Sequence, residues 1–136
     1  MKKKIILACA FLVLCGCTTV TKKGSVDYEN KYTGTVIKAT VEMNGDDIVK
    51  VSLDETYNDT TKRTIGKEYG MKGSSSIGRE WYEQIDFIEN YIEHHGLDAL
   101  KLNENGYAME YDVLGGCTIN LAAIKEAVNQ AVQSAK

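Results

Sequence analysis

The residues whose types and spacing could do chemistry lie near the C-terminus, in the stretch DVLGGCTIN (112–120). It contains Asp112, two adjacent glycines and Thr118, and it precedes an apolar pattern of helical period. The first N–H groups of a helix lack internal partners and lie at the positive end of its dipole, so they attract phosphate. Gly115 and Gly116 would let the backbone approach such an anion closely. The stretch is therefore either a phosphate cradle centred on the Thr118 hydroxyl or an ordinary loop.

Cys117 lies inside the same stretch and has two interpretations. A thiol at the start of a helix has a lowered pKa, which suits a nucleophile or a redox group. No histidine or other base can be placed beside it from the sequence, which favours a small buried residue. The other three cysteines lie within the first 17 residues. We therefore expect no disulfide framework and no cysteine metal site in the mature chain.

The N-terminus has the layout of a bacterial lipoprotein leader. Three lysines precede an apolar run that is too short to span a membrane, and small residues follow. The tetrapeptide Leu14-Cys15-Gly16-Cys17 resembles a lipobox, which makes Cys17 the expected lipidated N-terminus and residues 1–16 the signal peptide. The expected location is the extracytoplasmic face of the cell membrane. An ordinary cleaved secretory peptide is the alternative.

Removal of residues 1–16 leaves 13 basic and 19 acidic residues, a formal charge of −6. This acidic balance disfavours nucleic acid or an anionic lipid surface as a partner, so the membrane contact would be the lipid alone. Residues 17–30, which carry the lipid site, are polar and unpatterned and predict a flexible tether. About 100 residues, 31–136, then form one domain.

Two alternating segments predict a β-hairpin over residues 33–56. Asn44-Gly45 is the turn. The acidic pair Asp54-Glu55 is expected at the solvated end of the second strand. The inward positions are Thr35, Ile37, Ala39, Val41 and Met43 on the first strand, and Val49, Val51 and Leu53 on the second.

The rest of the chain predicts two amphipathic helices and a second hairpin. An apolar stripe at spacings of four and three predicts a helix from residue 77 to Gly96, and His94 and His95 in its last turn suit the helix dipole better than a metal. Residues 100–114 predict a hairpin. A C-terminal helix follows, capped by Thr118 or Asn120. The long connection 57–78 is either a flexible loop or ordered around a ligand. The expected class is α+β. The two stripes are Trp81, Ile85, Ile88 and Ile92, then Leu121, Ile124, Val128, Ala131 and Ala135.

Residues 112–118 resemble the covalent attachment motif of the FMN-binding domain family. That family includes flavin-carrying subunits of sodium-pumping quinone reductase and the Rnf complex, and membrane-anchored lipoproteins. Its motif runs Asp, two variable residues, Ser or Thr, Gly, Ala, and Ser or Thr. Asp112, Gly116 and Thr118 match it, whereas Gly115 replaces Ser or Thr and Cys117 replaces Ala. The first hairpin, with its YTGT start and NG turn, is also similar, so the resemblance spans most of the expected domain.

The resemblance implies an FMN-binding-domain-like fold, with FMN held at Thr118 through a phosphoester bond made by a separate flavin transferase. The protein would then be an electron carrier with an unknown redox partner, and no autonomous catalytic site is visible. The alternative is a flavin-free lipoprotein that uses the same fold as a surface binding or structural module. The residues available as a platform for the flavin ring are Tyr69, Met71, Trp81 and Tyr107.

Overall fold

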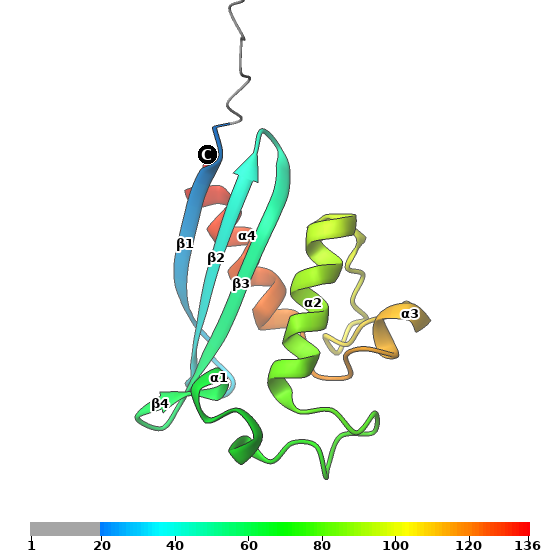
Figure 1. The fold of residues 1–136 in the computed structure, drawn as a ribbon. Coiled ribbons are helices and arrows are strands. Elements are labelled where there is room, and N and C mark those ends of the chain that lie inside the picture. The colour runs from blue at the N-terminus through cyan, green and yellow to red at the C-terminus, as the bar shows by residue number, and fades with distance from the viewer. Residues whose placement is uncertain (1–19) are drawn as a thin grey trace, which may run out of the picture.

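Four antiparallel strands form one sheet in the order β1-β2-β3-β4, as Figure 1 shows in ribbon form. The structure is a computed structural model that describes residues 20–136. The predicted signal peptide and the lipidation site at Cys17 therefore lie outside the described residues. The strands are β1 (Lys22–Glu29), β2 (Val36–Asn44), β3 (Asp47–Tyr57) and β4 (Thr60–Thr61).

The helices pack against this sheet, which confirms the α+β class. The two long helices are α2 (Trp81–His95) and α4 (Ala122–Ser134). Four shorter turns connect the elements, and two of them give order to the long connection 57–78. The two turns within 57–78 are α1 (Lys62–Ile65) and η1 (Gly66–Tyr69), and the other two are η2 (Leu97–Ala99) and α3 (Tyr111–Leu114).

The β2–β3 hairpin confirms the prediction for residues 33–56, with one change of phase. Val49 is 44% exposed instead of inward. The register shifts between Glu42 and Met43, so that Met43 pairs with Ile48 while Glu42 pairs with Lys50. Val49 is the extra residue of this irregularity, and a bulge of this kind turns the neighbouring side chains to the opposite faces of the sheet.

The tether predicted for residues 17–30 is wrong where the chain forms β1. Residues 22–29 pair with β2 along its whole length, from Lys22 opposite Met43 to Glu29 opposite Val36. Gly24 is buried against α4, where a Cβ would overlap the Ala131 carbonyl, and Val26 and Tyr28 pack against the core at the next two alternate positions. The alternation Gly24, Val26, Tyr28 is short and begins at a residue without a side chain, so its apolar signal in the sequence is weak.

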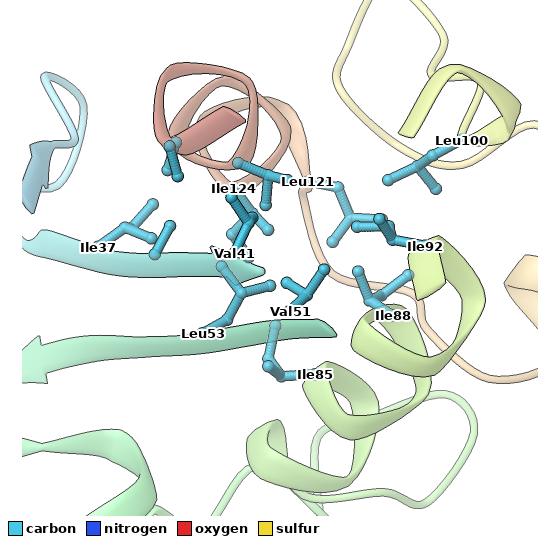
Figure 2. Packing of buried hydrophobic residues seen from close by; sticks show 14 of the residues in the cluster. Ile37, Val41, Val51, Leu53, Ile85, Ile88, Ile92, Leu100, Leu121 and Ile124 are labelled. Atoms are coloured by element: carbon cyan, nitrogen blue, oxygen red, sulfur yellow. The ribbon is translucent and has the colours of Figure 1, made fainter. Parts of the chain in front are cut away.

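The core lies between the sheet, α2 and α4. Both predicted helical stripes are buried there, and Leu100 joins them from the segment after η2. Figure 2 shows side chains of β2 and β3 pointing toward those of the two helices. Gly96, with a φ of 80°, ends α2 as predicted. A capping box between Glu80 and Glu83 begins the same helix.

Helix α2 also supplies hydrogen-bond acceptors to β3. The Leu53 N–H donates to Glu89 Oε1 at 2.6 Å, and the Val51 N–H donates to Glu93 Oε1 at 2.8 Å. Arg63 joins the cluster by donating to Glu89 and Asp86, both at 2.6 Å. Burial raises the pKa of Glu89 above its ordinary value, although the Leu53 N–H and Arg63 oppose this shift. The cluster holds the middle and the C-terminal part of α2 against the sheet.

The second predicted hairpin forms only at its tip. Leu102 and Ala108 make a single antiparallel bridge around the turn 103–106. The predicted returning strand to Leu114 is wrong, because residues 111–114 form α3. Val113 and Cys117 are both completely buried, and their spacing of four places them on one side of a helical turn.

Candidate functional site

The predicted site stretch runs from α3 across the base of α2 to the start of α4. Asp112 lies exposed in α3. Helix α4 begins after Leu121, so Thr118 does not cap it, and that part of the prediction is wrong. Asn120 contributes to the start of α4 instead, because its Oδ1 accepts a hydrogen bond from the Ala122 N–H at 3.0 Å. Thr118 therefore precedes the N-terminus of α4 without belonging to its cap.

The two glycines of the stretch have different structural roles. Gly116 is buried, and a Cβ at this position would overlap the ring of Phe87 on α2. Gly115 has φ −66° and ψ −20°, which every residue type can adopt, and a Cβ there would find its first neighbour at 3.6 Å. Only Gly116 is required by the packing, whereas a serine or threonine fits at residue 115.

Cys117 is a buried residue of the core, as the sequence favoured. It is fully buried, and its N–H donates to the Val113 carbonyl at 2.8 Å. Burial raises the pKa of its thiol to about 11, which outweighs the opposing hydrogen bond from the backbone of Ile119. The thiol is therefore protonated at neutral pH and is a poor nucleophile.

Thr118 is partly buried and is attached to α2 through Gln84. Its N–H donates to Gln84 Oε1 at 2.8 Å, and its hydroxyl lies 3.5 Å from the same oxygen. The backbone bond has ordinary length, whereas the hydroxyl contact is at the limit of a hydrogen bond. The backbone is thus held firmly while the hydroxyl is held weakly.

Gln84 connects this stretch to the loop before α2. It is completely buried, and its Nε2 donates to Ser75 Oγ and to the Arg79 carbonyl, both at 3.2 Å. The Nε2 also lies 3.5 Å from the sulfur of Met71. A single glutamine in an amphipathic helix gives no sign of this role in the sequence. Gln84 lies next to the predicted stripe, and only the fold brings residue 118 to it.

A groove follows the outer side of α2 above Asp112. This α2 groove has a volume of about 620 Å³. Along it, Phe87 stacks on Tyr91 with ring centroids 6.5 Å apart, and the ring centroids of Tyr91 and His95 are 4.6 Å apart. Charged residues surround these rings. The lining residues are Arg79, Glu83, Asp86, Phe87, Asn90, Tyr91, His94, His95 and Asp112.

A second cavity lies next to the residues that follow Thr118 in the chain, and residues of β2 and β3 also line it. It has a volume of about 520 Å³, and we call it the Trp81 cavity. Ile119 and Asn120, which directly follow Thr118, belong to its wall. Of the four predicted platform residues Trp81 alone lines it, and Tyr107 is 43% exposed. The remaining lining residues are Asn30, Tyr32, Thr33, Ile37, Glu55, Lys62, Glu104, Asn105, Gly106, Ala122, Ala123 and Ile124.

Glu55 in this cavity corrects one expectation. The sequence placed it at a solvated strand end, yet it is 6% exposed. Its side chain accepts from Lys62 Nζ and from Thr35 Oγ1, both at 2.6 Å. The signal was present, because the alternation of Val51 and Leu53 continues inward to residue 55.

Two surveys of the described residues complete the geometry. Within residues 20–136, no cluster of three or more histidine, cysteine, aspartate or glutamate side chains is placed to hold a metal ion. No helix in the same range has the length and apolar character needed to cross a membrane.

Comparison with known proteins gives little beyond this geometry. No family model matches the chain, and no solved structure matches it. A stretch of 37 residues is 46% identical to a chlorophenol reductase of Desulfitobacterium hafniense. The match covers 27% of this chain and 11% of that protein, so the similarity concerns only a small part of the relative.

Proposed function

We propose that the protein is a membrane-anchored flavin carrier, with FMN attached to Thr118 through a phosphoester bond and a lipid attached to Cys17. Electrons would pass through the flavin at the extracytoplasmic face of the membrane. A flavin transferase would install the cofactor, and a separate redox protein would exchange electrons with it.

The observation that carries the proposal is the state of the Thr118 side chain. Its backbone is fixed by a 2.8 Å bond to Gln84, yet its hydroxyl has only a 3.5 Å contact with the same oxygen. The side chain is partly exposed while Gly116 and Cys117 before it are buried. A modifying enzyme would therefore have no strong hydrogen bond of this hydroxyl to break.

The two departures from the FMN motif are compatible with its backbone. Gly115 has helical dihedral angles and room for a side chain, so the loop conformation suits the serine or threonine of the motif. Cys117 replaces alanine at a fully buried position, where both residues are small. The required glycine is Gly116, and it is the one that the motif and this chain share.

The chain's own groups would hold the cofactor and control its surroundings. Bound flavin supplies electron transfer in one-electron or two-electron steps, and the protein sets its potential and access. Thr118 provides the attachment oxygen. Gln84 positions the Thr118 backbone through its Oε1 and the Arg79 carbonyl through its Nε2. Arg79 takes part in this network through its backbone carbonyl, and it also lines the α2 groove.

Intact mass of the full-length chain, produced together with a flavin transferase, tests this proposal. We expect the added mass of one FMN, located by peptide mapping on the peptide that contains Thr118. Thr118→Val should lose this mass completely because it removes the hydroxyl and keeps the volume. Thr118→Ser should retain it, since the motif accepts either hydroxyl residue. Gly115→Ser, which restores the motif, should incorporate at least as much flavin as the parent.

Thr60→Val is the matched control, since Thr60 is also partly buried but lies in β4, away from the stretch. It should carry the same flavin as the parent protein. If the Thr118→Val chain still carries covalent FMN, the attachment site is a residue other than Thr118. A yellow protein that loses its colour on denaturation would indicate non-covalent FMN, and a colourless chain of unmodified mass would indicate a flavin-free binding or structural module.

A further inference from the structure

The Trp81 cavity has the shape and chemistry of a site for a planar aromatic group. Its volume of about 520 Å³ lies within the range of small-molecule sites. Trp81, Ile37 and Ile124 form apolar walls, and each of these side chains is less than 5% exposed. Ala123 leaves open space where a larger residue would fill the cavity. Such a surface favours a flat, largely apolar ring.

The cavity contains one buried ion pair, whereas its other polar lining residues are exposed or partly exposed: Asn30, Thr33, Glu104, Asn105 and Asn120. Lys62 Nζ lies 2.6 Å from Glu55 Oε2, and the two side chains are 11% and 8% exposed. Thr35 donates to the other oxygen of Glu55 at 2.6 Å. The Lys62 ammonium also lies 5.0 Å from the ring centroid of Tyr69 and 5.3 Å from that of Trp81.

This ion pair costs desolvation energy that its own attraction does not necessarily repay. An ammonium has three donors, and among the described residues Lys62 has one hydrogen-bond acceptor, Glu55. The remaining donors face aromatic rings, which are weaker partners than oxygen. A ligand with carbonyl acceptors at one edge and apolar faces would match both the ammonium and the walls.

We propose that the Trp81 cavity binds the isoalloxazine ring of the flavin, with Lys62 as a hydrogen-bond donor to the ring's carbonyl edge. This inference rests on the proposed attachment at Thr118. The chain supports the combination, because Ile119 is the next residue after Thr118 and lines the cavity. The ribityl part of FMN would connect the two.

The α2 groove is the competing place for the ring, and its composition argues against it. It offers Phe87 and Tyr91, but four charged side chains line it as well: Arg79, Glu83, Asp86 and Asp112. A ring bound there would have to desolvate these charged side chains, of which Asp86 is already paired with Arg63 at 2.6 Å. In the Trp81 cavity the two buried charges already neutralise each other. Loss of the Lys62 charge would leave the Glu55 carboxylate unpaired beside the ring, which would disfavour the reduced flavin because that form gains negative charge.

Riboflavin is the probe for the ring alone, because it lacks the phosphate. We would titrate riboflavin against the full-length Thr118→Val protein and follow the quenching of its fluorescence by Trp81. We expect saturable quenching, and we expect Ala123→Phe to weaken binding at least tenfold because the new side chain fills the cavity. Lys62→Met should weaken binding severalfold. Tyr91→Leu, in the α2 groove, should leave binding unchanged.

A second measurement uses the flavinylated protein. Trp81→Phe should raise the emission of the attached flavin severalfold, because Phe keeps the wall but is a much weaker quencher. The midpoint potential of Lys62→Met should be lower than that of the parent. Circular dichroism of each variant establishes that it is folded.

The outcomes separate this inference from the proposed function. If the chain never gains the mass of FMN but Ala123→Phe weakens its binding of riboflavin, the proposed attachment at Thr118 is wrong and the proposed ring site in the Trp81 cavity stands. If the fluorescence of riboflavin is not quenched, or if riboflavin binds Ala123→Phe as well as the parent, the cavity is not the ring site, even if the mass of FMN is present at Thr118. Loss of binding in Tyr91→Leu alone would place the ring in the α2 groove.

Discussion

Cys117 shows how a single residue in a reactive-looking stretch is made inert by its surroundings. A thiol near a helix N-terminus normally becomes more acidic. Here complete burial dominates, and the pKa of the thiol rises to about 11. The position therefore serves packing in this protein.

This burial predicts a loss of stability at high pH. The folded protein keeps the thiol proton up to about pH 11, whereas the unfolded chain releases it from about pH 9. Stability from this group is complete below pH 9 and is lost as the pH rises toward 11. Between pH 8 and 10.5 the free energy of unfolding should fall by about 2 kcal/mol more in the parent than in Cys117→Ala. Urea unfolding measures both proteins, and equal losses would contradict a buried thiol.

The residues of the candidate site were predictable only where the chain places them next to one another. Asp112, Gly116 and Thr118 share one stretch, so their types and spacing could be recognised. Gln84 and Lys62 are isolated polar residues that reach the site through tertiary structure. Local sequence carries no information on such contacts, and the partner of Gln84 lies 34 positions away.

At the scale of elements, the site stretch is attached to α2 by a contact that tolerates no side chain. Gly116 lies against the Phe87 ring, whereas a Cβ at Gly115 would meet its first neighbour at an ordinary contact distance of 3.6 Å. Gly116→Ala should therefore destabilise the protein by about 1 to 3 kcal/mol through overpacking. Gly115→Ala should be neutral or stabilise by about 0.5 kcal/mol, since its backbone is helical.

Urea unfolding of the two variants checks this difference. Phe87→Leu in the Gly116→Ala background should recover part of the lost stability, because the smaller side chain makes room for the methyl group. Equal stability of Gly116→Ala and Gly115→Ala would mean that the stretch does not pack on α2 in this manner.

The elements that could be predicted are those whose own residues carry the periodicity. The β2–β3 hairpin and helices α2 and α4 have long apolar alternations or stripes. Two errors arose where the burial depends on a partner element. Strand β1 packs on α4 through Gly24, which carries no apolar signal, and on the core through the partly buried Val26 and Tyr28. Residues 111–114, predicted as a strand, form α3, in which Val113 is buried.

At the scale of the molecule, the sheet separates the start of the described chain from the Trp81 cavity. Strand β1 begins opposite Met43, close to the β2–β3 turn, and ends opposite Val36. Glu55 of the cavity pairs with Ile37 at that second end. Eight residues of strand span roughly 25 Å, and Figure 1 shows the blue start of β1 at the opposite end from α1 and β4. With the proposed lipid preceding β1, the cavity would face away from the membrane, toward a redox partner.

That arrangement depends on β1 being part of the domain, and Gly24 tests it. A valine there favours a strand but would overlap the Ala131 carbonyl of α4. Gly24→Val should lower the free energy of unfolding by about 1 to 3 kcal/mol and reduce hydrogen-exchange protection along β1. Gly73→Val is the control, because Gly73 has an ordinary φ and no neighbour within 4 Å. If both variants are as stable as the parent, residues 22–29 do not pack on α4, and the tether predicted from their composition is the better description.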